Sequence, residues 1–386
     1  MKIYLLPYTN RTYFSYKKRA SGIDQGTLCQ LNALQSAGHN VRLFSAFTDL
    51  HKSIPGIDYY KEEIPSEWSV KDYEAAKRNV IIEKMFKSIK DFQPDVILSN
   101  YLFNHYPYEK LMNLEIPIIF SSMTNPGFWS DLNSVDLLND FTSAGHTFIN
   151  CSEYHKERTQ QFYKRWDHVD IVADDILFCA YANKEHVQVS DGKVRHCSAA
   201  NVEKSTFYIH DILEDTDIDT EVFTAFEYLN NNSKNGKYIS KNMDRFADKT
   251  RLNVDHGQMV NEIGKSVCTF VGLASYDTFT ITSLESLSRG VPVIVKNYKG
   301  QHPAKEMLPE EYQQYVHIFE DKKDFVNKIK EWSSLTISQR QEIADACYSV
   351  TSKKAYTDRL VRICNNAITK YKNNSKNTLH LGQFMI

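Results

Sequence analysis

Two acidic residues, with seven residues between them, lie in a stretch that could hold a diphosphate and the hydroxyl groups of a sugar. The stretch SYDTFTITSLESLSRGVPVIVK (275–296) contains Asp277 and Glu285 among small hydroxyl residues. A helix expected from Thr282 would direct free N–H groups and positive dipole towards the preceding loop, an arrangement that favours a diphosphate. Glu285 could accept hydrogen bonds from ribose hydroxyls, and Asp277 from the hydroxyls of a sugar. The residues expected to contact such a ligand are Asp277, Thr278, Phe279, Thr280, Ile281, Thr282, Ser283 and Glu285.

The same residues also allow a purely structural interpretation. Thr282 followed by Glu285 reads T-x-x-E, which is a capping box and needs no ligand. The polar loop 275–281 is nevertheless longer than the roughly 2–6 residues usual in α/β connections. The length and polarity of the loop favour a binding role.

The first half of the chain predicts a doubly wound parallel sheet. Helices are expected at 26–38, ending on Gly38, and at 79–92. Ser152 is expected to cap a helix within 146–166, after a strand. Strand and helix signals alternate over this half, as in parallel α/β sheets. The apolar runs that read as strands are 2–8, 39–47, 94–100 and 116–122.

A second α/β unit follows a boundary near residue 185. Strand-like runs recur at 193–200, 267–274 and 315–319. Segment 230–237 is expected to form a surface loop, and acidic segment 214–221 a solvated loop or a helix start. The tail from about 322 to 372 is mostly amphipathic and helical. Two such units facing each other would form a cleft, and ligands bind beyond the carboxyl ends of the strands.

Composition narrows the class of protein. The chain has 386 residues, which suits two domains, and a net charge of −2, which gives no global basic field for nucleic acid. Seven dispersed cysteines without a CxxC pair argue against a disulfide framework or a cysteine zinc site. No signal peptide and no apolar run of about 20 residues are present. We therefore expect a cytoplasmic protein that does not insert into a membrane.

Segment 275–296 resembles the nucleotide-sugar site of retaining GT-B glycosyltransferases. Their motif E-G-F-G-x-x-x-x-E, followed by G-x-P-V-I, reads DTFTITSLE and then GVPVI here, with Thr278 and Thr280 in place of the two glycines. The resemblance implies two Rossmann-like domains with an interdomain cleft. It implies an acceptor-binding domain at 1–185 and a nucleotide-sugar-binding domain at 186–355. A helix and tail at 356–386 would cross back to the first domain.

The resemblance also implies a cation for the donor phosphates. Segment 198–206 lies where the family has G-R-x-x-x-x-K-G, so that Lys204 matches the lysine. Ala199 replaces the arginine, and Arg195 or Lys296 are the candidates to substitute for it. Members of this family generally lack a metal clamp, so we expect a UDP-sugar co-substrate without a metal.

Within the GT-B enzymes, the chain looks most like the DNA glycosyltransferases of T-even bacteriophages. That resemblance implies transfer from a UDP-sugar to 5-hydroxymethylcytosine in duplex DNA, in the host cytoplasm. Segment 9–19 interleaves aromatic and basic residues, which would suit phosphates and a flipped base. A solvated cationic loop or contacts to the donor diphosphate explain it equally well. The basic residues of the segment are Arg11, Lys17, Lys18 and Arg19.

The catalytic base is open among Asp24, His105 and Asp131, each expected on or near a loop after a strand of the first domain. Two other functions compete with DNA modification. One is a bacterial glycosyltransferase of envelope or capsule synthesis, for which 75–92 is a possible membrane-facing helix. The other is an inactive GT-B-like binding module, which the missing loop glycines and Ala199 keep open.

Overall fold

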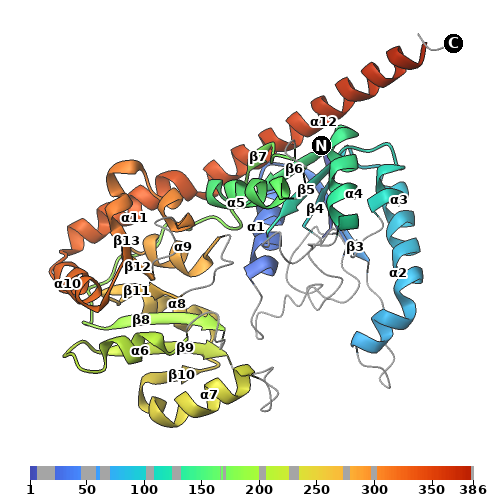
Figure 1. The fold of residues 1–386 in the computed structure, drawn as a ribbon. Coiled ribbons are helices and arrows are strands. Elements are labelled where there is room, and N and C mark those ends of the chain that lie inside the picture. Colours follow the sequence, from blue (N-terminus) through green and yellow to red (C-terminus); the bar gives the residue numbers. More distant parts are fainter. Residues whose placement is uncertain are drawn as a thin grey trace. The chain divides into compact units, whose positions relative to one another are not determined.

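The chain folds into two compact units, Met1–Ala180 with Tyr356–Ile386, and Tyr181–Ala355. A computed structural model describes residues 1–6, 22–44, 58–60, 70–100, 108–123, 132–165, 167, 171–199, 206–225, 234–272, 279–296 and 302–383. Figure 1 shows the helices and strands of both units. Among the described residues, no helix is both long and apolar enough to cross a membrane.

The first unit is built on a parallel sheet of seven strands in the order β3-β2-β1-β4-β5-β6-β7. Its strands are β1 (Lys2–Leu6), β2 (Asn40–Phe44), β3 (Asp58–Tyr60), β4 (Val96–Ser99), β5 (Ile118–Ser122), β6 (Thr147–Asn150) and β7 (Asp175–Ile176). Its helices are α1 (Gly22–Ser36), α2 (Val70–Phe92), α3 (Tyr108–Met112), α4 (Leu132–Ser143), α5 (Glu153–Lys164) and, from Tyr356 onward, α12 (Lys353–Gln383). Nearly every residue of β1, β4, β5 and β6 is buried, as in parallel strands whose sheet is covered on both faces.

Side chains from α2 and α4 form the core on one face of this sheet. Met85 and Ile89 of α2 and Leu138 of α4 are fully buried there against the strands. Ser152 caps α5 as predicted, since its Oγ accepts a hydrogen bond from the His155 backbone N–H at 2.9 Å. Gly38 has φ +76°, the left-handed conformation expected of the glycine that ends α1.

The second unit has six parallel strands in the order β10-β9-β8-β11-β12-β13. The strands are β8 (Val194–Ala199), β9 (Thr220–Ala225), β10 (Thr250–Leu252), β11 (Cys268–Val271), β12 (Val293–Lys296) and β13 (Val316–Phe319). The helices are α6 (Tyr208–Leu213), α7 (Lys234–Arg245), α8 (His256–Gly264), α9 (Ile281–Leu287), α10 (Lys322–Trp332) and α11 (Ile337–Thr351), with 3-10 turns η3 (Ala247–Lys249), η4 (Pro303–Met307) and η5 (Glu310–Tyr315).

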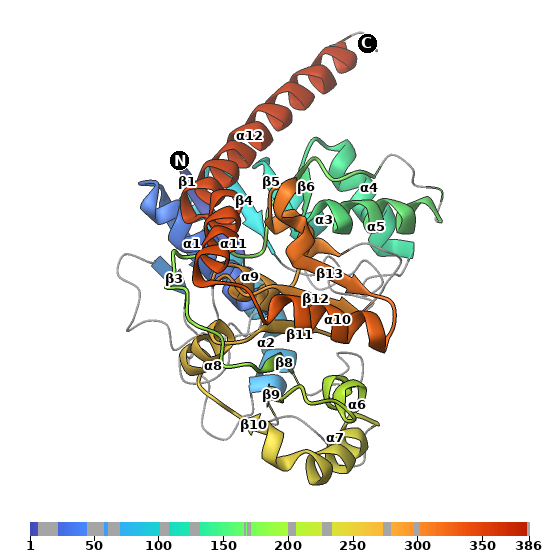
Figure 2. The ribbon, with the colours of Figure 1, turned by 90° about the vertical axis from the view of Figure 1, so that its left-hand side faces the viewer.

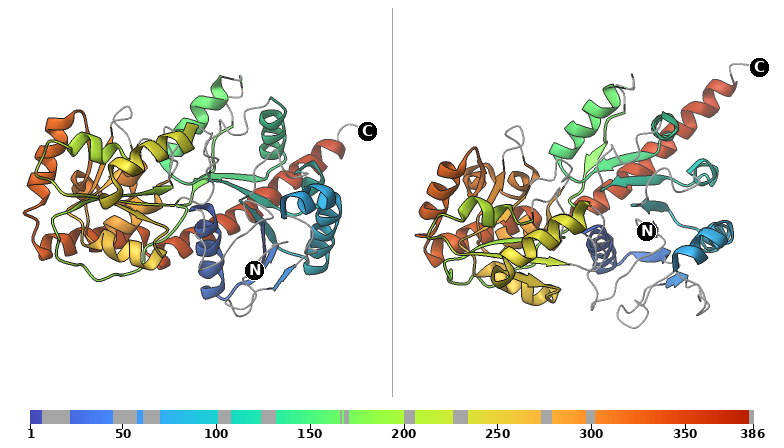
Figure 3. Two further views of the ribbon diagram at one scale, coloured as in Figure 1. Left: turned by 90° about the horizontal axis from the view of Figure 1, so that it is seen from below. Right: turned by 60° about the horizontal axis from the view of Figure 1, so that its bottom comes forward.

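Helices cover both faces of the second sheet (Figure 3). Ile212 of α6 and Phe325 of α10 belong to the core on one face, together with Phe270 of β11. On the other face, Ile263 of α8 packs against Cys197 of β8 and Phe223 of β9. The predicted pair of doubly wound parallel sheets is confirmed.

Three local predictions differ from the structure. Segment 230–237 is not all loop, because α7 begins at Lys234. The acidic segment 214–221 runs into β9 at Thr220, and Glu221 is buried in an ion pair. Helix α1 begins at Gly22, earlier than predicted.

Candidate active site

The two loops singled out in the sequence follow neighbouring strands at the centre of the second sheet. Strands β8 and β11 pair in parallel, and the order of strands reverses between them. In open α/β sheets such a reversal is where ligands bind, beyond the carboxyl ends of the strands. Lys204 follows β8 along the chain, and Asp277 and Thr278 follow β11. These three residues lie outside the described part of the chain.

Glu285 is not part of a capping box. Helix α9 begins at Ile281 with Thr280 as its N-cap, so Thr282 already lies inside the helix. Thr282 Oγ donates to the Cys197 backbone carbonyl at 3.3 Å, and Thr280 Oγ donates to Ser283 Oγ at 2.6 Å. The structural interpretation of T-x-x-E is therefore wrong, and the role of the Glu285 carboxylate must be sought elsewhere.

The carboxylate of Glu285 meets the imidazole of His256, the first residue of α8. His256 Nε2 lies 2.7 Å from Glu285 Oε1, and the Glu285 side chain is 13% exposed. The hydrogen bond to Glu285 raises the pKa of His256 above its ordinary value, against the lowering effect of burial. Helices α8 and α9 pack against each other on this face of the sheet (Figure 1). His256 was not predicted, because its partner lies far along the sequence.

Hydroxyl groups fix α9 to the strands. Ser286 Oγ donates to Thr269 Oγ of β11 at 2.8 Å, and Ser283 is fully buried. The contact from Thr282 to Cys197 ties the helix to β8, two residues before that strand ends. The small side chains of this segment thus position α9 between the two central strands, while Phe279 is buried and Ile281 is half-buried.

Polar side chains form a series of hydrogen bonds around β8, the strand that precedes Lys204. His196 Nδ1 lies 2.8 Å from the Phe270 carbonyl oxygen, and its Nε2 lies 2.7 Å from Ser198 Oγ. Ser198 Oγ in turn lies 3.3 Å from Thr206 Oγ. These contacts link β11, the end of β8 and Thr206, the first described residue after Lys204.

Of the two residues considered as substitutes for the missing arginine, Lys296 lies at the appropriate end of the sheet. It is the last residue of β12, the strand beside β11. Its Nζ lies 3.7 Å from the centre of the Tyr208 ring, and burial lowers its pKa. A half-buried lysine at a carboxyl strand end suits an anionic ligand.

Arg195 is placed differently from its predicted donor contact. It lies four residues before Ala199, about 13 Å back along an extended strand. Its guanidinium is 1% exposed and is enclosed by Asp191 at 2.5 Å, Glu221 at 2.8 Å and Glu262 at 3.5 Å. These carboxylates account for the charge of Arg195, so the structure corrects its assignment from phosphate binding to an internal ion-pair network.

The predicted residues of the first unit are mostly outside the described chain. Asp24 lies in the first turn of α1 rather than on a loop. His105 and Asp131 fall outside the described residues, as do the basic residues Arg11, Lys17, Lys18 and Arg19. Their roles remain predictions. Within the described ranges, no group of three or more His, Cys, Asp or Glu side chains is arranged to hold a metal ion.

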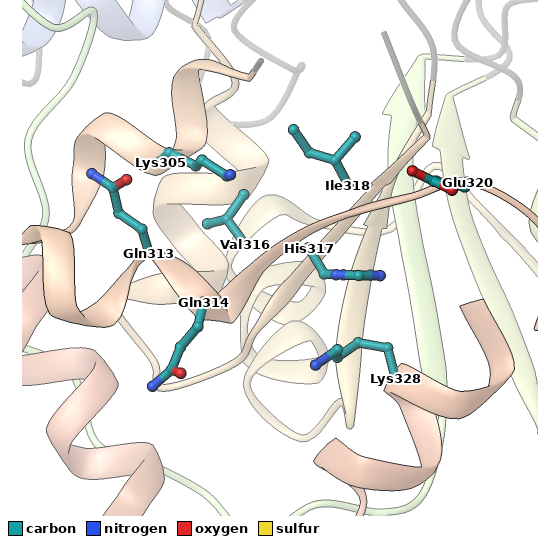
Figure 4. A pocket seen from close by; sticks show the side chains of 8 residues that line it. All are labelled: Lys305, Gln313, Gln314, Val316, His317, Ile318, Glu320 and Lys328. Carbon is teal, nitrogen blue, oxygen red and sulfur yellow. The ribbon is translucent and has the colours of Figure 1, made fainter. Parts of the chain in front are cut away.

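A hollow of about 450 Å³ lies along β13, the edge strand of the second sheet. None of the described residues of the 277–285 motif lines it (Figure 4). Lys305 of η4 and Lys328 of α10 line this hollow (Figure 4), and α10 packs beside β13 (Figure 2). Lysines near a short edge strand oppose its pairing with another chain.

Comparison of the whole chain with solved structures identifies the fold. Sucrose-phosphate synthase from Thermosynechococcus elongatus superposes with a TM-score of 0.70 at 12% identity, over 96% of this chain and 99% of that one. The chain has the GT-B fold. Anabaena HepE in complex with UDP and glucose gives 0.66 at 10% identity, over 94% and 98%. The lipopolysaccharide outer core galactosyltransferase WaaB gives 0.58 at 14%, over 96% and 99%.

No family model matches the sequence, and no curated protein matches it. The GT-B assignment therefore comes from the structure. At these low sequence identities it concerns the fold alone. In a GT-B chain the two halves are Rossmann-like units, which agrees with the strand orders of both sheets.

Proposed function

We propose that the protein is a glycosyltransferase that uses a UDP-sugar. The observation that carries this proposal is the largely buried Glu285 side chain, which lies on α9 beside the two central strands and is not used as a helix cap. It stands where the resemblance to GT-B enzymes puts the acid that binds ribose. The presence of UDP in the HepE complex supports the choice of nucleotide.

In the proposed reaction, the bond from the anomeric carbon to the diphosphate oxygen breaks, and a bond from that carbon to an acceptor hydroxyl oxygen forms. UDP leaves with the electron pair, and the acceptor proton passes to a base or to the departing diphosphate. Lys204 and Lys296 would neutralise the diphosphate. Asp277 would hold the sugar and Glu285 the ribose. Asp24, His105 and Asp131 are the candidate bases.

For the acceptor we propose the hydroxymethyl group of 5-hydroxymethylcytosine in duplex DNA. Segment 9–19 supports this choice, because its basic and aromatic residues suit phosphates and an unstacked base. The test is mass spectrometry of nucleosides from hydroxymethylated and plain duplex DNA, each incubated with the protein and a panel of UDP-sugars. A pentose or hexose mass on hydroxymethylcytosine alone supports the proposal. Modification of neither DNA, with UDP bound, contradicts the DNA acceptor.

A second acceptor class, an envelope or capsule glycan, is favoured by two observations. The fold is shared with WaaB, a lipopolysaccharide galactosyltransferase. Helix α2 also carries exposed Lys87 and Lys90 and an exposed Val80, as on a membrane-facing helix. Binding to anionic lipid vesicles that depends on these lysines would favour this acceptor over DNA.

An inactive binding module is the remaining alternative, and slow donor hydrolysis distinguishes it. A glycosyltransferase without acceptor transfers sugar to water at a low rate, whereas a binding module releases none. We expect free sugar and UDP to appear in equal amounts from the correct UDP-sugar.

A further inference from the structure

We propose that His256 is a positioning residue that orients Glu285 towards the ribose of the donor nucleotide. The inference rests on the proposed function, because it assigns Glu285 to the nucleotide. It concerns a residue that lies outside the double-acid motif and belongs to a different helix. The contact between His256 Nε2 and Glu285 Oε1, at 2.7 Å, is the starting observation.

His256 is held in place by the way α8 begins. Asp255 is the N-cap of α8, and its Oδ1 accepts hydrogen bonds from the backbone N–H groups of Gly257 at 2.9 Å and Gln258 at 3.3 Å. Further along the helix, Val260 and Ile263 are buried in the unit. The backbone that carries the imidazole is therefore fixed on both sides of the first turn.

Glu285 is held at its backbone and at one carboxylate oxygen. Its carbonyl accepts hydrogen bonds from Arg289 Nη1 at 3.1 Å and from Ser288 Oγ at 3.2 Å. His256 occupies Oε1. Among the described residues, no hydrogen bond to Oε2 is formed, and the Glu285 side chain is 13% exposed. One oxygen is thus anchored and the other is left for a ligand donor, such as a vicinal diol.

The charges around the pair support this division of roles. Asp255 adds to the effect of Glu285 in raising the pKa of His256, whereas Arg289 lowers it. Arg289 Nη2 is itself paired with Glu185 Oε1 at 3.2 Å. A positively charged imidazole beside Glu285 would offset the repulsion between that carboxylate and a nucleotide diphosphate. Charge-assisted hydrogen bonds of this kind also restrict the direction of the carboxylate.

A double-mutant cycle with two nucleotides tests the inference. UDP and 2′,3′-dideoxy-UDP are titrated calorimetrically into the full chain as wild type, His256→Ala, His256→Gln, Glu285→Gln, and the combination of His256→Ala with Glu285→Gln. We expect His256→Ala to weaken UDP binding about fivefold to tenfold, which is less than the loss of a direct hydrogen bond to a charged group because His256 acts on UDP only through Glu285. His256→Gln, whose amide can replace Nε2 as a donor, should restore most of that loss.

Two further results are expected if His256 acts through Glu285. His256→Ala should cause no additional loss when Glu285 is already Gln, and no loss for the dideoxy nucleotide. Unchanged UDP affinity in His256→Ala overturns the inference alone, as does an equal loss in both Glu285 backgrounds. Absence of UDP binding by the wild type overturns the proposed function and this inference together. Melting curves of each variant identify any loss that comes from unfolding.

Discussion

His256 Nε2 lies 2.7 Å from Glu285 Oε1, so the second acid of the 277–285 motif contacts α8, a helix that precedes the motif by one strand. This contact replaces the capping interaction that the sequence T-x-x-E suggests. The Glu285 side chain is 13% exposed in this position. A carboxylate in that position is costly to bury without partners, and a bound ribose would complete its hydrogen bonding.

Replacing Arg195 should affect stability and leave donor binding unchanged. Arg195→Met leaves Asp191, Glu221 and Glu262 without their shared cation, which we expect to cost about 3–5 kcal/mol in the free energy of unfolding. Urea titration measures this loss, and UDP affinity of the folded variant should stay within about twofold of wild type.

Arg251→Met is the matched control, because Arg251 also pairs with Glu221 but its side chain is 61% exposed. We expect a cost of about 1 kcal/mol or less for that variant. A large drop in UDP affinity for folded Arg195→Met, with little change in stability, would return Arg195 to the phosphate site.

Gly290 should tolerate no side chain. Its φ is +73°, and an added Cβ would lie 2.1 Å from the Arg340 carbonyl oxygen. Arg340 cannot move easily, because it is buried and donates to the Ser266 and Gly264 carbonyls at 2.9 Å each. We expect Gly290→Ala to destabilise the protein by more than 2 kcal/mol, roughly the cost of strain and overlap together.

Gly192→Ala separates the two contributions to that cost. Gly192 has φ +86° but nothing within 4 Å of an added Cβ. The Gly192→Ala variant should lose only about 1 kcal/mol in the free energy of unfolding, from backbone strain alone. Equal melting temperatures for the two variants would show that the contact with Arg340 is unimportant.

Acid should destabilise the first unit through His146. Burial lowers the pKa of His146 to about 4, with a smaller effect from Lys370, and the ring stacks between Phe141 and Tyr371. Its Nδ1 accepts a hydrogen bond from the Ile118 N–H at 3.2 Å, which requires the unprotonated nitrogen. In the unfolded chain the pKa is about 6.5.

The unfolded state therefore binds the additional proton between these two values. The contribution of His146 to the free energy of unfolding is fully present above about pH 6.5. It is lost as the pH falls towards 4, by up to about 3 kcal/mol. His146→Asn keeps an acceptor and removes the titration, so its unfolding free energy should vary less over this range. His210, whose pKa is also lowered to about 4, contributes in the same direction in both proteins. Parallel pH profiles for variant and wild type would contradict the prediction.

Neutralising Lys17, Lys18 and Arg19 should weaken binding to hydroxymethylated duplex DNA and flatten its salt dependence. Each lost phosphate contact reduces the slope of log affinity against log salt by about 0.9. Fluorescence anisotropy at several salt concentrations measures both quantities. Neutralising Lys87 and Lys90 on α2 is the control, and it should leave DNA binding unchanged. DNA binding that is insensitive to residues 17–19 would remove this segment from the acceptor site.

Much of the fold could be predicted from local patterns. The apolar runs that became β1, β4 and β5 are buried on both faces, so their composition alone identifies them. The cap at Ser152 is also local. Strands β3 and β7 are only three and two residues long, too short to show a period.

The site could be predicted only in part, because its contacts join distant segments. The motif at 277–285 was recognisable by spacing. The bond between Glu285 and His256 spans 29 residues and depends on how α8 packs against α9. Arg195 is near segment 198–206 in the sequence, yet the extended strand places it about 13 Å before Ala199. The prediction that Thr282 caps a helix was wrong because α9 already begins at Ile281, with Thr280 as its N-cap.

Calorimetric titration of UDP into wild type and Glu285→Ala tests the central claim most directly. The bond to ribose is made by a charged acceptor, so its loss should weaken binding by about tenfold to a hundredfold while the melting temperature stays close to that of wild type. UDP binding by the wild type that drops in this way supports a nucleotide-sugar site at Glu285. Equal affinities in the two proteins, or no binding by the wild type, would contradict it.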